Sequence, residues 1–149
     1  MTSLDRAIAY WSFDWLPSDR LPGIALDALE HGIESPSILE LACREGAEGI
    51  VLHELFKKAL SELGKSPLSK LQAGRIIALE YAEHIISGRI PPVEGARLIW
   101  KVSLECEELI KELGIFGGRV SEYEDLPSQR ELICDTIRAE AKELLKHAR

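Results

Sequence analysis

The sequence has few cysteines and no apolar run that reaches the roughly 18 residues a membrane-spanning helix needs. Its N-terminal stretch lacks a basic segment followed by an apolar core, because Asp5 and Asp14 interrupt it, so no secretion signal is expected. Three widely spaced cysteines, Cys43, Cys106 and Cys134, do not form an even disulfide framework. We therefore expect a cytoplasmic protein whose cysteines are reduced and buried.

The sequence also lacks the short motifs of several enzyme and nucleotide-binding classes. It has no G-x-S-x-G elbow, no G-x-x-x-x-G-K-[ST] phosphate loop and no G-x-G-x-x-G fingerprint. His53-Glu54 begins like the zinc-protease motif H-E-x-x-H, but Lys57 stands where the second histidine is required. These absences favour a protein that is not an enzyme and that uses no cofactor.

Glu80 and His84 are the strongest metal-ligand pair in the sequence. They lie four residues apart, whereas di-iron bundles pair Glu and His three apart and add Glu residues from facing helices. Neither Glu54 nor Glu105 shows a pattern that would complete such a site. We interpret the pair as a helix-surface contact and predict no metal. A small helical metal-binding protein or enzyme around Glu80 and His84 remains the alternative.

The charge that is present is mostly negative and lies early in the chain. The net charge is −7, and residues 1–48 hold nine acidic residues against three arginines, a net charge of −6. An acidic balance disfavours nucleic acid and anionic membranes as partners and is compatible with a basic protein partner. The simpler interpretation is that these charges keep the protein soluble.

Apolar residues recur at helical spacing along nearly the whole chain. Serine–proline pairs at 35–36 and 66–67 mark helix starts, and Gly32, Gly64 and Gly88 mark helix ends. No segment alternates strictly enough to predict a strand. The pattern predicts an all-α, single-domain bundle over 1–149, with six to seven helices and short loops. The expected helices are about 3–16, 22–32, 35–46, 50–64, 68–88, 91–114 and 128–148.

Residues 114–130, GIFGGRVSEYEDLPSQR, are predicted to be the longest loop. Its glycines follow a helix end, where the helix dipole is negative, so a phosphate site is not expected. Ser128 and Glu131 have the spacing of a capping box that starts the last helix. A tyrosine among acidic residues suits a binding surface. The predicted partner-binding residues are Glu122, Tyr123, Glu124 and Asp125.

The alternative is that Phe116 and Tyr123 fix this loop to the core while the acidic residues face water. Four aromatic residues near the N-terminus pose the same choice: Tyr10, Trp11, Phe13 and Trp15. The two tryptophans, four apart, are expected to enter the core. The other two either pack under the following loop, which we favour, or form an exposed patch. Asp14 and Asp19 beside them are further candidates for partner binding.

Three segments resemble a group of small helical bacterial proteins: residues 25–42 (ALDALEHGIESPSILELA), 95–100 (GARLIW) and 121–133 (SEYEDLPSQRELI). The shared features are an A-L-E-x-G-x-x-S-P-x-x-x-x-L-A run and an acidic segment before the last helix. No established activity is attached to the group. By analogy with small acidic immunity proteins, the resemblance implies direct binding of a basic toxin, and it transfers no functional residues. A self-associating structural or regulatory subunit is a third hypothesis.

Overall fold

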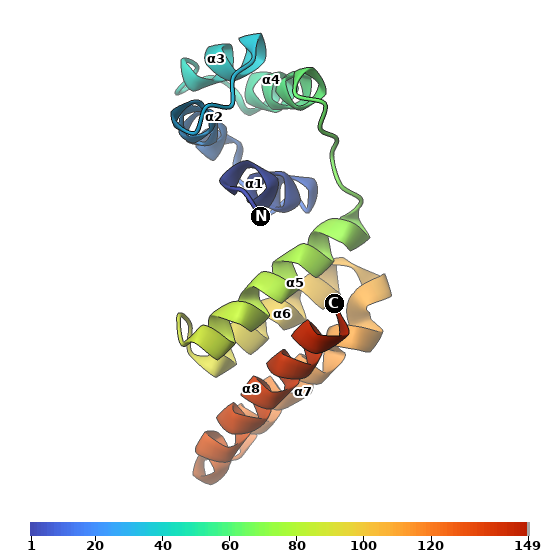
Figure 1. The fold of residues 1–149 in the computed structure, drawn as a ribbon. Helices are drawn as coiled ribbons and strands as arrows, with labels where there is room; N and C mark the ends of the chain where they lie inside the picture. The colour runs from blue at the N-terminus through green and yellow to red at the C-terminus, as the bar shows by residue number, and fades with distance from the viewer. Residues whose placement is uncertain (149) are drawn as a thin grey trace. The chain divides into compact units, whose positions relative to one another are not determined.

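The computed structural model describes residues 1–148 and confirms the all-α prediction: this part contains helices and no strand (Figure 1). It has eight α-helices, so the predicted number of six to seven is too low. Single 3-10 turns span Ser18–Arg20, Glu107–Leu109 and Pro127–Gln129. The α-helices are α1 (Ser3–Ser12), α2 (Leu21–Glu30), α3 (Pro36–Ala42), α4 (Gly49–Glu62), α5 (Lys70–Ser87), α6 (Pro92–Glu105), α7 (Ile110–Asp125) and α8 (Arg130–His147).

The chain divides into two compact units, Met1–Ala73 and the residues from Gly74 onward. The first unit holds α1 to α4, and the second holds most of α5 together with α6, α7 and α8. Each is described below by itself. That the whole of 1–149 is one domain stays a prediction.

The first unit packs four helices around one apolar core. Local signals set its helix ends: the Ser35 hydroxyl accepts a hydrogen bond from Ile38 N, and Gly32 and Gly64 turn the chain at φ values of +80° and +70°. A left-handed residue after a helix satisfies its last carbonyls and sends the chain back. The core residues are Leu4, Ile8, Leu21, Ala25, Ile38, Leu41, Leu52, Phe56, Ala59 and Leu60.

The aromatic residues near the N-terminus partly reverse the expected arrangement. Tyr10 and Phe13 are buried, which confirms the favoured interpretation, whereas Trp11 and Trp15 are only half-buried. The reason is that α1 ends at Ser12 and Asp14 adopts a φ of +62°. The chain turns there, so Trp15 is not on a helix face shared with Trp11.

In the second unit, α6 packs along α7, and α8 contacts both (Figure 1). Close approach between helices depends on glycine: a Cβ atom at Gly95 of α6 would lie 2.4 Å from the Ile85 side chain of α5. The core residues of this unit include Ile77, Ala82, Ile85, Ala96, Ile99, Val102, Leu109, Leu113, Phe116, Val120, Ile133, Ile137 and Ala141.

The predicted loop at 114–125 is wrong, and this error accounts for the extra helix. After α6 the 3-10 turn Glu107–Leu109 leads into α7, which runs through Gly114, Gly117 and Gly118 to Asp125. The glycines are inside the helix because α7 packs closely on α6: a Cβ atom at Gly117 would lie 2.7 Å from the indole ring of Trp100.

Two predicted helix starts also shift. The last helix begins at Arg130 with no side-chain cap, so the box predicted from Ser128 and Glu131 does not form. The fifth helix begins at Lys70 instead of following Ser66. A capping box forms there: Gln72 N donates to Ser69 Oγ at 3.1 Å, and Ser69 N donates to Gln72 Oε1 at 3.0 Å.

The cysteines are free, but only Cys106 is buried. Cys43 is exposed in the short segment after α3, and Cys134 is half-buried on α8, so the expectation of three buried cysteines is wrong.

Candidate functional site

The four predicted binding residues of 122–125 form the last turn of α7. Three of the four side chains contact cations of the same chain. Glu122 pairs with Arg119 at 2.8 Å, and Glu124 pairs with Arg97 at 2.6 Å.

Tyr123 is also engaged within the chain. The guanidinium carbon of Arg130 lies 4.6 Å from the centre of the Tyr123 ring, and Arg130 Nε donates to the Tyr123 carbonyl oxygen at 3.0 Å. Arg97 and Arg119 therefore neutralise part of the charge of Glu124 and Glu122. Because opposite charges this close cancel at longer range, the turn attracts a basic partner less than the sequence suggests.

Asp125 is the exception on this turn. It is exposed, and no ion pair to it occurs among the described residues. Asp14 and Asp19 are exposed as well and belong to the first unit, Asp14 at its left-handed turn and Asp19 in the turn Ser18–Arg20. These three carboxylates remain candidates for contacts with a partner.

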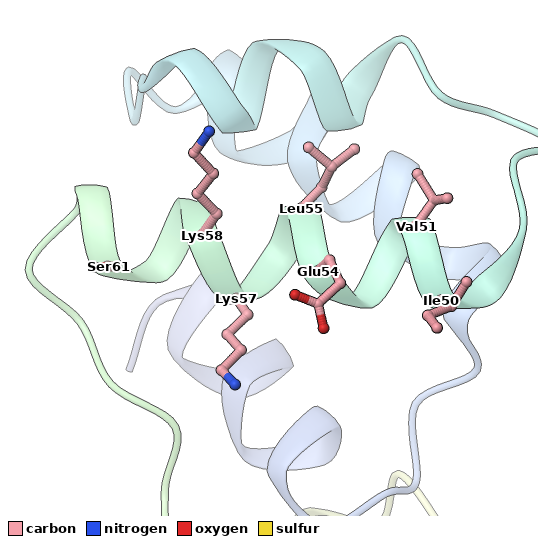
Figure 2. A pocket seen from close by; sticks show the side chains of 7 residues that line it. All are labelled: Ile50, Val51, Glu54, Leu55, Lys57, Lys58 and Ser61. Carbon is pink, nitrogen blue, oxygen red and sulfur yellow. The ribbon is translucent and has the colours of Figure 1, made fainter.

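A mixed surface lies along α4 in the first unit (Figure 2). Ile50 is 70% exposed, and Val51 and Leu55, four residues apart, share a helix face beside it. Figure 2 shows that every labelled side chain comes from this one helix. Lys57 and Lys58 outnumber Glu54, so the surface is locally positive. Its charge does not suit a basic partner.

The second unit has a more enclosed groove between α5, α7 and α8, with a volume of about 880 Å³. Pockets that bind ligands commonly have volumes of about 300–1,000 Å³, mostly apolar walls and a few polar groups. This groove has that composition. Its apolar residues are Ala78, Leu79, Leu113, Ile115, Phe116 and Leu144, and the charged or titratable residues are Arg75, Glu112, Glu140, Glu143 and His147.

Two of the groove's carboxylates lie at its exposed edge and have partners. Arg75 Nη2 contacts Glu112 at 2.8 Å, and His147 Nε2 lies 3.3 Å from Glu143. Both pairs are well exposed, so water screens them and they contribute little to stability.

Glu140 is the most buried carboxylate of the groove, with a side chain 18% exposed. Arg119 directs both Nε and Nη2 to Glu140 Oε1, each at 2.9 Å. The hydrogen bond with Glu140, and after it that with Glu122, raises the pKa of Arg119 against the opposing effect of burial. Arg119 therefore bridges Glu140 Oε1 and Glu122 Oε1.

The other oxygen, Glu140 Oε2, is buried and has no hydrogen-bond partner in the described part of the chain. Polar atoms in protein interiors are nearly always hydrogen-bonded, so this buried carboxylate oxygen is an exception to the rule. Among the buried side-chain oxygens and nitrogens of residues 1–148, this is the single such atom.

Glu80 and His84 lie on α5, and the ring of His84 is 6.1 Å from that of Tyr81, centre to centre. In the described residues, no three His, Cys, Asp or Glu side chains come close enough together to hold a metal ion. The structure thus offers this pair no further ligands of these types.

Sequence reasoning misses the groove and its central pair, Arg119 and Glu140. A signal is present: Glu140 lies beside the apolar stripe of α8 and is four residues before Leu144, which shares its helix face. Periodicity assigns the whole stripe to the core, so a carboxylate at its border does not stand out.

No described helix has the length and apolarity required to cross a membrane. Comparison with protein-family models, with curated proteins and with solved structures finds no match to this chain.

Proposed function

We propose that this protein is a non-enzymatic, cytoplasmic binding protein that engages a basic protein partner. The observation that carries the proposal is the groove between α5, α7 and α8, where three carboxylates, two of them paired with Arg75 and Arg119, surround an apolar floor. The most concrete form of the proposal is an immunity protein that neutralises a basic toxin by covering part of its surface.

The charge of the protein supports this proposal. A net charge of −7 on 149 residues attracts basic proteins over a distance and speeds their encounter. Asp14, Asp19 and Asp125 are exposed and serve as steering charges. Among the candidates, the groove supplies the apolar contact that holds a partner after the encounter, because the exposed Ile115 and the half-buried Leu79 and Leu144 line it.

A pull-down from native lysate tests the function. Tagged protein is used at low salt and at about 0.5 M salt, where the Debye length is about 4 Å. We expect one stoichiometric, basic protein that is bound at low salt and reduced at high salt. Recovery of the bait alone at both salt concentrations contradicts the proposal.

A variant series then locates the contact. If the turn at the end of α7 is the anchor, Tyr123→Ala weakens partner binding far more than it lowers the melting temperature. If the groove is the anchor, Ile115→Arg weakens binding and Tyr123→Ala does not. Ile115 is 48% exposed, so this substitution places a cation in the groove without replacing a core residue.

Two other hypotheses have direct tests. A self-associating subunit is suggested by the exposed aliphatic side chains of Leu104 and Leu132, which are 62% and 64% exposed, and light scattering measures the mass in solution. A metal-binding protein built on Glu80 and His84 would purify with stoichiometric zinc, iron or manganese. Either result would replace the proposal above.

A further inference from the structure

We propose that Trp11 and His53 form a pH-sensitive contact, which holds the C-terminal end of α1 on α4 while His53 is neutral and loosens it when His53 takes up a proton. The indole Nε1 of Trp11 donates to His53 Nδ1 at 2.9 Å. An imidazole nitrogen accepts a hydrogen bond only while it carries no proton, so the neutral ring bears its proton on Nε2. This inference goes beyond the proposed function and does not depend on it.

Protonation of His53 removes the acceptor of this hydrogen bond. Both nitrogens of a charged imidazole are donors, so the Nδ1–H group would face the indole N–H group and no hydrogen bond could join them. Histidine is the side chain that ordinarily changes its charge between about pH 5 and pH 8. Acidification within that range therefore breaks the contact between α1 and α4.

The contact lies where several bonds of α1 meet. The ring of Trp11 packs edge-on against the fully buried Phe56 of α4, with ring centres 5.0 Å apart. The next residue, Ser12, accepts a hydrogen bond from Leu68 N at 3.0 Å, and the Trp11 carbonyl accepts one from Asp14 N at 3.0 Å. A movement of Trp11 therefore reaches both the left-handed turn at Asp14 and the segment that follows α4.

No ion pair within residues 1–148 compensates for a proton on His53. The turn Ser18–Arg20, α2 and α3 pack on α4, and α1 reaches it through Trp11. The charged or titratable side chains of these elements and of α4 itself are Asp5, Arg6, Tyr10, Asp19, Arg20, Asp27, Glu30, Glu40, Glu54, Lys57, Lys58 and Glu62. In the described part of the chain none of them forms an ion pair or a hydrogen bond with His53. Protonation therefore loses the bond from Trp11 without gaining a paired carboxylate.

His31 responds to pH in the opposite direction. Its hydrogen bond with the Asp27 carbonyl oxygen, and after it the charge of Asp27, raise the pKa of His31 above its ordinary value of 6.5. A raised pKa means that the protonated group stabilises the folded state. This contribution is complete below the ordinary value and is lost as the pH rises through the raised one. The effect of His53 is therefore measured as a difference between variants that all keep His31.

The pH dependence of stability in the full chain tests the inference. His53→Gln keeps a side-chain oxygen that can accept from the indole but takes up no proton, and His84→Gln removes an imidazole from α5 as the control. Between about pH 7.5 and about pH 5.5, the folding equilibrium constant of the unsubstituted protein should fall about fivefold more than that of His53→Gln, as expected for one lost hydrogen bond. His84→Gln should retain this extra dependence.

Hydrogen exchange measured by NMR shows whether the end of α1 is loosened. The indole N–H of Trp11 and the backbone N–H of Leu68, which bonds Ser12, report on two sides of the contact. After correction for the pH dependence of intrinsic exchange, both should lose protection at the lower pH in the unsubstituted protein. In His53→Gln their protection should stay constant.

Two outcomes overturn the inference. One is the same pH dependence of stability in His53→Gln and in the unsubstituted protein. The other is loss of protection at the Trp11 indole without any at Leu68, because the bond would then break without loosening α1. Trp11→Phe supplies a second test should His53→Gln fail to fold: it lacks the bond at every pH, so persistence of the extra pH dependence in this variant also overturns the inference.

Discussion

Gly117 of α7 lies directly against the indole ring of Trp100 on α6, and a Cβ atom at position 117 would be 2.7 Å from both Cδ1 and Nε1 of that ring. A real Cβ contact is essentially never this short, so even a methyl group forces the two helices or the indole to move. The packing of α6 on α7 thus depends on the smallest side chain at this one position.

Gly117→Ala is expected to destabilise the protein by about 1–3 kcal/mol, the usual cost of overpacking. The matched control is Gly118→Ala, because no atom lies within 4 Å of a Cβ at that position. Alanine is the better helix former there and should stabilise by up to about 1 kcal/mol. Urea denaturation of both variants measures the difference, and equal shifts in one direction would show that the Trp100 contact is unimportant.

A second prediction concerns Glu62, whose carboxylate accepts hydrogen bonds from Ser37 Oγ at 2.7 Å and from Ser37 N at 2.9 Å. These bonds, the side-chain one first, lower the pKa of Glu62 below its ordinary value of 4.5. A group whose pKa is lower in the folded state stabilises that state at pH values above its ordinary pKa. The contribution is lost as the pH falls through the lowered, folded-state value.

Glu62→Ala should therefore lower the melting temperature near neutral pH, and its difference from the unsubstituted protein should shrink as the medium becomes acidic. Glu54→Ala makes the same change of helix propensity at another exposed position of α4 and serves as the control. Thermal melts across the acidic range provide the comparison. A difference that stays constant with pH would mean that the bonds to Ser37 contribute nothing.

A third prediction separates packing from hydrogen bonding at Trp11. Its indole Nε1 donates to His53 Nδ1 at 2.9 Å, and its ring meets that of Phe56 edge-on with centres 5.0 Å apart. Trp11→Phe keeps an aromatic ring but leaves the imidazole nitrogen without its donor, and should cost about 1–2 kcal/mol.

Trp11→Ala removes the ring too and should cost up to about 3 kcal/mol, because the side chain is only half-buried. Trp15→Phe is the control, because it makes the same replacement of an indole by a phenyl ring at a residue that does not bond His53. Chemical denaturation measures the free energy of unfolding of each variant. If both phenylalanine variants lose the same stability, the hydrogen bond to His53 has no separate effect.

A fourth prediction concerns Arg119, which forms ion pairs with both Glu140 and Glu122. Arg119→Met leaves the Glu140 carboxylate partly buried without its cation and should cost about 1–3 kcal/mol. Adding Glu140→Gln should recover part of this loss, because the remaining group is no longer charged. The double-mutant cycle yields their coupling, expected near 1 kcal/mol.

Arg138→Met provides the reference for an exposed pair, because Arg138 contacts Asp135 at 2.8 Å on the surface of α8. Its cost should stay below about 0.5 kcal/mol. A cost for Arg119→Met as small as that for Arg138→Met would show that burial adds nothing to the Glu140 pair.

The parts of the fold that sequence reasoning predicts correctly are those set by neighbouring residues. Ser35 caps α3 as expected, since a serine before Pro36 needs no distant contact to accept from Ile38 N. Gly32 and Gly64 end their helices with positive φ for an equally local reason. Such signals are complete within a few residues of the chain.

The errors arise where the structure at a position depends on a residue far away in the sequence. Gly117 has the same local appearance as a helix-ending glycine, and only Trp100, 17 positions earlier, explains why it belongs inside a helix. The acidic turn at 122–125 is visible in the sequence as charge, but Arg97 comes from another helix and Arg130 from the next one. The groove needs three helices at once, so periodicity within any one of them does not predict it.

The three glycines of α7 have a consequence for how this helix forms. Each costs about 1 kcal/mol of helix propensity relative to alanine, so together they remove about 3 kcal/mol from a 16-residue segment that would be marginal by itself. An excised peptide of residues 110–125 is expected to be largely unstructured in water. The helix that carries Glu122 to Asp125 is thus conditional on its neighbour, because the packing of Gly117 against Trp100 has to offset its low helix propensity.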